Sequence, residues 1–110
     1  MKPLAVITCG PAYEPIDQVR RMTNISTGEF GRILAEAFIA ADWEVICCRG
    51  QGATERLLPT KAVLEEFGTN RDLLAVLQAI ANESQPIHAV LHAAALCDFE
   101  LAEILSNKEK

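Results

Sequence analysis

Short apolar runs alternate with segments of helical periodicity along this chain, and that alternation constrains the fold more than any other feature. Apolar runs of strand length lie at 4–9, 44–48, 62–67 and 87–95. Apolar residues at helical spacing indicate helices over 27–41 and 70–81. The order strand, helix, strand, strand, helix, strand favours right-handed crossovers and a mainly parallel sheet. We therefore expect an α/β fold, Rossmann-like and three-layered.

The connection between the first strand and the first helix is unusually long. It runs from Gly10 to about Ile25, whereas strand-to-helix connections usually have roughly 2–6 residues and longer ones are often functional. Pro11 and Pro15 stiffen it by fixing φ, and it carries both charged and apolar residues. In a parallel sheet, ligands bind beyond the carboxyl ends of the strands, which is where this connection begins. We expect an ordered, functional loop here.

Length and charge narrow the class of protein. The 110 residues make one domain, 1–110, and 50% of them are hydrophobic, enough for one core. A net charge of -5 argues against a nucleic-acid groove or an anionic membrane surface, since both need clustered Lys and Arg. A phosphate site remains compatible, because backbone N–H groups and one or two cations can build it locally.

The cysteines and the N-terminal segment indicate a cytoplasmic protein. Cys9, Cys47, Cys48 and Cys97 form no C-x-x-C pair, and most lie in or beside predicted buried strands. We interpret them as reduced thiols, of which Cys9 is the one to test for reactivity. The apolar run at 4–9 is shorter than the ~7–15 residues of a signal-peptide core. No run reaches the ~18 apolar residues of a membrane span.

The segment 26–31, S-T-G-E-F-G, opens the first predicted helix. A helix N-terminus favours anions, and Gly28 lets backbone approach a phosphate closely. The alternative is a plain capping box, with Ser26 as N-cap and Glu29 reaching back. Neither the G-x-G-x-x-G fingerprint nor the P-loop pattern occurs, so no standard nucleotide motif decides between them.

Other polar residues have two interpretations each. Arg20 or Arg21 suits a phosphate or carboxylate, or pairs with Glu14 or Asp17 to hold the loop. Asn24 suits an oxyanion or a turn. Asp98 follows an alanine run at a strand end, where it suits a ribose hydroxyl, or it caps a helix at 99–105. His88 and His92 are four apart in a strand, roughly 13 Å, so no metal site is expected.

Two blocks resemble one family. Residues 10–31, G-P-A-Y-E-P-I-D-Q-V-R-R-M-T-N-I-S-T-G-E-F-G, are similar to the signature loop of phosphopantothenoylcysteine synthetases, and 92–99, H-A-A-A-L-C-D-F, to a second family segment. The resemblance implies a ligase of coenzyme A biosynthesis. Phosphopantothenate would be activated by CTP, or ATP, with Mg²⁺, as an acyl-nucleotidyl intermediate that cysteine then attacks. It also implies a homodimer.

The resemblance also implies roles for particular residues. The catalytic group would comprise Asn24, Arg20 and Lys108. The nucleotide would be bound by Gly10, Ser26, Thr27, Gly28, His92, Ala93, Ala94, Asp98 and Lys108, with Asp98 on the ribose.

The sequence departs from the family pattern in places. Ala12 stands where the family has threonine, Thr27 where it has a second serine, and Glu29 where lysine is common. Family domains are roughly twice as long, so the fold is expected to be truncated at its C-terminus. Two other functions are weighed: a non-catalytic nucleotide- or phosphate-binding module of the same fold, and a flavin or dinucleotide domain, against which the missing glycine fingerprints argue.

Overall fold

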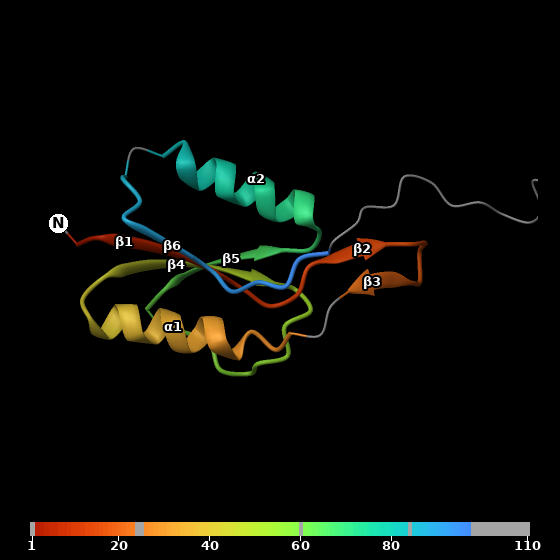
Figure 1. The fold of residues 1–110 in the computed structure, drawn as a ribbon, viewed down its shortest axis with the longest axis horizontal. Helices are drawn as coiled ribbons and strands as arrows, with labels where there is room; N and C mark the ends of the chain where they lie inside the picture. The colour runs from red at the N-terminus through yellow and green to blue at the C-terminus, as the bar shows by residue number, and fades with distance from the viewer. Residues whose placement is uncertain (1, 24–25, 60, 84, 98–110) are drawn as a thin grey trace, which may run out of the picture.

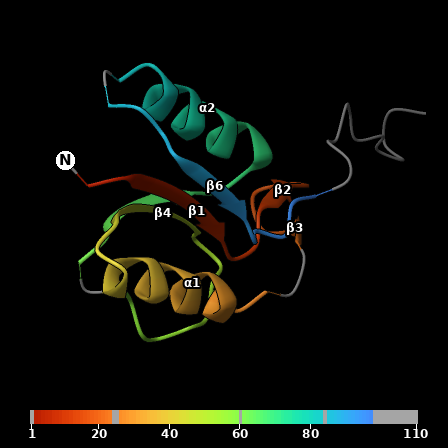
Figure 2. The ribbon, with the colours of Figure 1, turned by 60° about the vertical axis from the view of Figure 1, so that its left-hand side comes forward.

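The computed structural model describes residues 2–23, 26–59, 61–83 and 85–97. Its centre is a four-stranded parallel sheet in the order β5-β4-β1-β6. The strands are β1 (Leu4–Cys9), β4 (Glu44–Gly50), β5 (Val63–Phe67) and β6 (Ala89–His92). Helices α1 (Glu29–Ala40) and α2 (Asn70–Ala81) cover opposite faces of the sheet (Figures 1 and 2). The predicted three-layer α/β fold is confirmed.

Strand β1 forms the centre of the core, and all six of its residues are buried. Its side chains alternate between the two faces. Ala5 and Ile7 pack in the cluster that includes Ala35 of α1, whereas Val6 packs with Phe67 and other residues on the α2 side. Fully burying an aliphatic side chain of this size contributes roughly 1.5–3 kcal/mol, so a sheet covered on both faces has two such layers to stabilise it.

The link from β4 to β5 contains no helix among its described residues, 51–59 and 61–62. Parallel neighbours need a crossover, and this one is irregular chain that passes beside α1 (Figure 1). Glu55 on the crossover pairs with Arg32 of α1 at 2.9 Å. The backbone N–H of Glu55 donates to the carbonyl of Thr27 at 2.8 Å. These contacts hold the crossover against the start of α1.

The long connection after β1 contains an antiparallel hairpin that the sequence analysis did not predict. It consists of β2 (Tyr13–Pro15) and β3 (Arg21–Thr23), and it extends beyond the carboxyl end of the main sheet (Figure 1). The turn is stabilised by Asp17, whose Oδ1 accepts the N–H groups of Val19 at 2.9 Å and Arg20 at 2.8 Å. The connection is therefore ordered over these residues, as expected, but it contains two short strands that were not predicted.

Element boundaries differ from the prediction in places. Helix α1 begins at Glu29, two residues later than expected, and β6 covers only Ala89–His92. Gly50 does not break β4 but ends it as a strand residue. A Cβ at Gly50 would lie 2.1 Å from the carbonyl oxygen of Pro11, so a side chain is excluded there by close packing.

The two helices begin differently. In α2, the Thr69 side chain accepts from the N–H of Asp72 at 3.1 Å, and Asp72 Oδ2 accepts the Thr69 N–H at 2.9 Å. In α1, the N-cap is Gly28 in the left-handed region, φ 86°, which has no side chain of its own to cap the helix, and the preceding Thr27 hydroxyl accepts the N–H of Glu29. The predicted capping box of Ser26 and Glu29 is therefore wrong, because the left-handed turn at Gly28 moves the start of the helix past Ser26.

Candidate functional site

Three segments meet tightly at the carboxyl edge of the sheet. Gly10, after β1, has φ 78°, and a Cβ there would lie 2.9 Å from the Cβ of Ala53. A Cβ at Gly28 would lie 3.2 Å from the same atom. Both glycines thus combine a left-handed backbone with close approach to the crossover. This packing places two predicted site residues, Gly10 and Gly28, at one junction.

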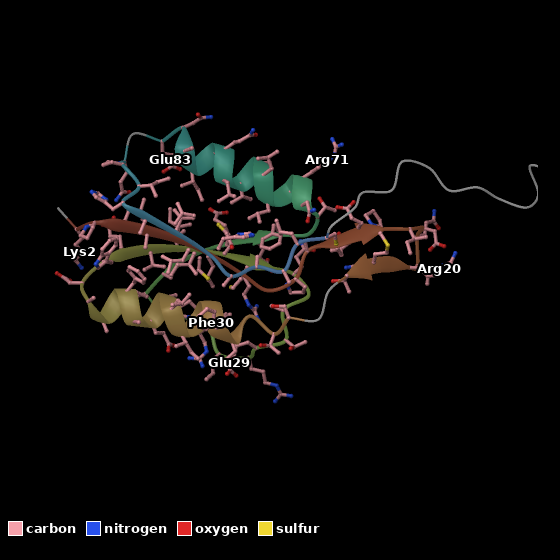
Figure 3. The ribbon with its side chains drawn as sticks, in the orientation of Figure 1. Lys2, Arg20, Glu29, Phe30, Arg71 and Glu83 are labelled. Carbon is pink, nitrogen blue, oxygen red and sulfur yellow. The ribbon has the colours of Figure 1, made fainter. Side chains whose placement is uncertain are left out.

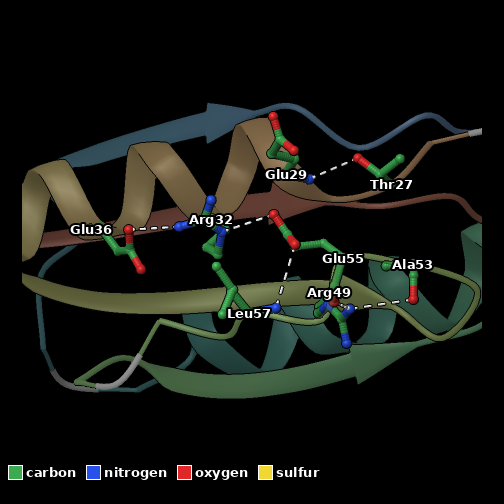
Figure 4. Close-up of polar contacts among 8 residues, drawn as sticks. All are labelled: Thr27, Glu29, Arg32, Glu36, Arg49, Ala53, Glu55 and Leu57. Carbon is green, nitrogen blue, oxygen red and sulfur yellow. Dashed lines mark hydrogen bonds and ion pairs between the residues drawn. The ribbon is translucent and has the colours of Figure 1, made fainter.

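The first turn of α1 points its backbone donors at this edge. The Thr27 hydroxyl accepts the N–H of Glu29 at 3.1 Å, as Figure 4 shows. A Cβ at Gly31 would lie 2.1 Å from the Cβ of Cys9, so only glycine lets the helix pack directly against the end of β1. Because a helix N-terminus carries unpaired N–H groups and roughly half a positive charge, this position suits an anion.

The exit of β6 lies against the end of β1. The Ala93 N–H donates to the Thr8 carbonyl at 3.0 Å, and the Ala95 N–H donates to the Gly10 carbonyl at 3.0 Å. The buried Thr8 hydroxyl accepts the Ala94 N–H at 3.2 Å and lies 2.7 Å from His92 Nδ1. The Thr8 hydroxyl can bond both groups at once, because it has one O–H donor and two acceptor lone pairs.

These bonds bring Gly10, His92, Ala93 and Ala94 into one stretch of the carboxyl edge, as the parallel topology predicts. Asn24, Asp98 and Lys108 lie outside the described residues, so their roles stay predictions. The segments that lead to two of them do meet. The sulfur of Cys97 lies 3.7 Å from the carbonyl oxygen of Met22, and Asn70 bonds both backbone groups of Cys97, at 2.7 and 3.2 Å.

Arg20 lies at the far end of the hairpin from α1, as Figure 3 shows. Its guanidinium pairs with Asp17 at 2.7 Å and is largely exposed. The hydrogen bond from Arg20, together with the backbone N–H groups of Val19 and Arg20, lowers the pKa of Asp17 to about 2. Of the two interpretations of Arg20, the structure shows the loop-holding pair. Its catalytic role stays a prediction.

A polar network that the sequence analysis missed supports the crossover (Figure 4). Arg32 lies between Glu36, at 2.8 Å, and Glu55, at 2.9 Å. The hydrogen bond from Arg32 lowers the pKa of Glu55. Arg49 donates to the carbonyl of Ala53 at 3.3 Å and to that of Glu55. Only the Arg32–Glu36 pair has a sequence signal, because it lies at helical spacing. Arg32 and Glu55 are far apart in the sequence, and Arg49 bonds backbone carbonyls.

Two pockets mark the two ends of the sheet. One of about 240 Å³ lies at the carboxyl edge and is lined by Tyr13, Arg21, Thr23, Ser26, Gly52 and Thr54, with Pro11 also in its wall. The other, about 500 Å³, lies at the amino ends of the strands, where Leu4, Val45 and Val63 contribute to it. None of the described residues predicted for the site lines the larger pocket, so its size does not make it the functional site.

The remaining candidates have structural partners. Cys9 is 2% exposed, with its sulfur 3.6 Å from that of Cys47, so it is shielded from reagents in the folded chain. His88 Nδ1 accepts the Leu4 N–H at 3.2 Å. No group of three His, Cys, Asp or Glu among the described residues is placed to hold a metal. No helix in the described part of the chain is long and apolar enough to cross a bilayer.

An open, parallel α/β sheet with a helix start and two strand exits at one edge defines a Rossmann-like domain. In such sheets, ligands generally bind at this edge. Residues 2–110 match the family described as DNA/pantothenate metabolism flavoprotein C-terminal domain, and the chain belongs to that family.

Individual relatives support the same family membership. The chain is 32% identical over 105 residues to the coenzyme A biosynthesis bifunctional protein CoaBC of Bacillus subtilis, covering 96% of this chain and 25% of that protein. The crystal structure of a CoaBC C-terminal domain has a TM-score of 0.77 at 32% identity, over 93% of this chain and 49% of that one.

The DNA/pantothenate metabolism flavoprotein of Streptococcus pneumoniae has a TM-score of 0.75 at 30% identity, over 89% of this chain and 41% of that one. The chain therefore spans a quarter of the curated relative and less than half of these solved chains.

Proposed function

We propose that this chain is part of a phosphopantothenate–cysteine ligase of coenzyme A biosynthesis. One observation carries the proposal. The segment that resembles the synthetase signature forms the left-handed start of α1 against the carboxyl edge of the sheet, beside Gly10. The relative CoaBC, named for coenzyme A biosynthesis, supports the same assignment.

In the proposed reaction, the phosphopantothenate carboxylate attacks the α-phosphorus of CTP, or ATP, and pyrophosphate leaves. The amine of cysteine then attacks the acyl carbon and displaces the nucleoside monophosphate. Both steps use good leaving groups, so the protein's main contribution is to position the reactants and stabilise developing charge.

The described residues support the placement of a phosphate chain. We assign it to Ser26, Thr27 and the N–H groups that follow Gly28, since these donors lie at the positive end of α1. The His92–Ala94 segment would form the neighbouring wall, where small side chains leave room for a nucleotide. Asn24, Asp98 and Lys108 complete the proposal: Asn24 at the acyl intermediate, Asp98 at the ribose, and Lys108 on phosphate.

Mg²⁺ is part of the proposal as a companion of the nucleotide. Nucleotide sites usually hold this ion through substrate phosphates, water and one or two carboxylates. The ion would neutralise charge on the phosphates when bound, and the backbone donors of α1 would orient those phosphates. A homodimer is proposed on the resemblance, and the solution mass of the chain tests it.

The test is an assay of cysteine-dependent pyrophosphate release with phosphopantothenate and CTP-Mg²⁺. It should be run on the chain and on a longer form with the length of the solved relatives. Asn24→Ala should abolish release in the longer form, while Thr69→Ala, at the start of α2, should leave it unchanged. If the longer form releases no pyrophosphate, the ligase proposal is wrong, whether or not the chain binds nucleotide.

A non-catalytic binding module is the second candidate. Two observations favour it: Arg20 is engaged by Asp17 away from α1, and Glu29 places a negative charge in the first turn of α1. This candidate predicts that the longer form binds CTP or phosphopantothenate without releasing pyrophosphate. The two candidates are therefore separated by turnover alone.

A further inference from the structure

Arg21 is held differently from its neighbour Arg20. It lies on β3 with its guanidinium carbon 3.9 Å from the centroid of the Tyr13 ring. In the hairpin register, Tyr13 pairs with Thr23 and Pro15 with Arg21, so the side chains of these four residues share one face. That cation–π contact orients the guanidinium without neutralising its charge.

The same face forms one wall of the 240 Å³ pocket, and the opposite wall comes from Ser26 and from Gly52 and Thr54 of the crossover. The described lining contains one cation, several hydroxyl groups and no carboxylate. The described lining is therefore positively charged, although the chain as a whole has a net charge of -5. None of the ion pairs among the described residues involves Arg21, whereas Arg20 and Arg32 are both paired.

We propose that this pocket binds a phosphoryl group, with Arg21 as its principal donor. An arginine fork matches phosphate geometry and forms charge-assisted hydrogen bonds to it. The volume, about 240 Å³, is below the roughly 300–1,000 Å³ typical of a whole ligand site. The pocket therefore fits one anionic group of a larger molecule.

The position of the pocket connects it to the proposed active site. Ser26 lines the pocket and lies two residues before Gly28, where the positive end of α1 begins. A ligand that reaches from α1 into the pocket would place two phosphoryl groups, or a phosphate and a carboxylate, on adjacent donors. The choice of ligands rests on the proposed function. The phosphoryl group in the pocket has two possible sources, the polyphosphate of the nucleotide and the phosphate monoester of phosphopantothenate.

Calorimetric titrations of the full chain with CTP, tripolyphosphate and phosphopantothenate test the inference. Cytidine and pantothenate, which lack phosphate, serve as blanks. Arg21→Gln should weaken at least one phosphorylated probe by roughly 10-fold or more, the scale of a lost charge-assisted fork. Arg21→Lys should restore part of the affinity. Loss with CTP and tripolyphosphate identifies the nucleotide as the source, and loss with phosphopantothenate alone identifies the monoester.

Arg56→Gln is the matched control, because Arg56 is an exposed arginine of the crossover that does not line the pocket. It should change affinity less than about two-fold, the scale expected of a screened surface charge. Thr54→Val removes a hydroxyl from the opposite wall without touching the hairpin, and should also weaken binding. If Arg21→Gln alters the circular dichroism spectrum, and so the fold, the result for Thr54→Val tests the inference instead.

The inference is overturned if the wild-type chain binds no phosphorylated probe, or if Arg21→Gln and Thr54→Val both bind every probe as the wild type does. Equal losses in Arg21→Gln and Arg56→Gln also overturn it, since that result indicates only long-range charge. Its failure is distinct from that of the ligase proposal. If phosphate binding depends on Arg21 but the protein shows no turnover, the pocket proposal stands and the ligase proposal fails. If Arg21→Gln has normal turnover and KM, the ligase proposal stands and the pocket proposal fails.

Discussion

The two helices of this chain have the same length, twelve residues, and each has an acidic residue in its first turn, yet they begin in opposite ways. Helix α2 begins with a complete capping box, in which Thr69 and Asp72 satisfy each other's backbone groups. Helix α1 begins at a left-handed glycine that forms no capping box, and the Thr27 hydroxyl accepts the N–H of Glu29.

The two helix starts therefore differ in how the N–H groups of their first turns are bonded. An N-cap side chain typically contributes about 1 kcal/mol to helix stability. The chain uses one at α2, beside the turn that follows β5. At α1 the Thr27 hydroxyl accepts the N–H of Glu29, and the helix start lies at the carboxyl edge, where we propose that a ligand binds the other N–H groups of the first turn.

The largest effect on the two helix starts is expected from a substitution that separates α1 from the sheet. In Gly31→Ala the new Cβ would lie 2.1 Å from the Cβ of Cys9, so the helix must shift. The better helix propensity of Ala returns only about 1 kcal/mol. We expect a net loss of about 2–3 kcal/mol in the free energy of unfolding, measured by urea titration. Gly52→Ala, which meets only Pro11 Cγ at 3.2 Å, is the control, and equal midpoints for the two variants would contradict the packing argument.

Gly28→Ala changes the start of α1 itself. An alanine at φ 86° costs about 1–2 kcal/mol in the free energy of unfolding, because its Cβ approaches the following carbonyl oxygen. We also expect CTP binding to fall by roughly ten-fold or more, since the backbone donors at the helix start lose their alignment. Denaturation and calorimetry measure the two effects. Unchanged CTP affinity in a destabilised protein would show that the glycine serves folding alone.

Thr69→Ala is the converse experiment at α2. Loss of the N-cap hydroxyl should cost about 1 kcal/mol in the free energy of unfolding, with no change in phosphate affinity. Urea titration with and without CTP checks both parts. A fall in CTP affinity comparable to that of Gly28→Ala would mean that the two helix starts do not differ in function.

The smallest effect is expected from Glu29→Gln. The carboxylate in the first turn competes with an anionic ligand for the positive end of α1. Its removal should raise affinity for CTP or pyrophosphate by roughly 2- to 5-fold at low ionic strength, and the gain should disappear in high salt. Asp72→Asn, in the first turn of α2, should give no such gain in a parallel titration.

Much of the fold is predictable because the periodicity of apolar residues and the order of the segments can be read directly from the sequence. The runs at 4–9 and 44–48 and the helical spacings imply a parallel sheet, and this topology alone brings Gly10 beside Ala93 and Ala94. The hairpin escaped prediction because its strands have three residues each, too few to define a period, and because proline is rare within strands.

The start of α1 was predicted wrongly for a different reason. The spacing from Ser26 to Glu29 fits a capping box, but the left-handed turn at Gly28 decides the geometry instead. The contacts of Arg49 with the crossover join residues whose partners are backbone carbonyls, and these leave no mark in a sequence. The 240 Å³ pocket lined by Arg21 was not predictable either, because its walls come from three separate segments of the chain.

The contact of Ala53 with two left-handed glycines limits how this crossover can diverge. Any larger residue at position 53 would push apart the end of β1 and the start of α1, so both would have to adjust together. Arg56, Leu57 and Leu58 are exposed and lie outside that junction. Substitutions should therefore be tolerated at 56–58 and selected against at Ala53, which a library of crossover variants scored for folding would reveal.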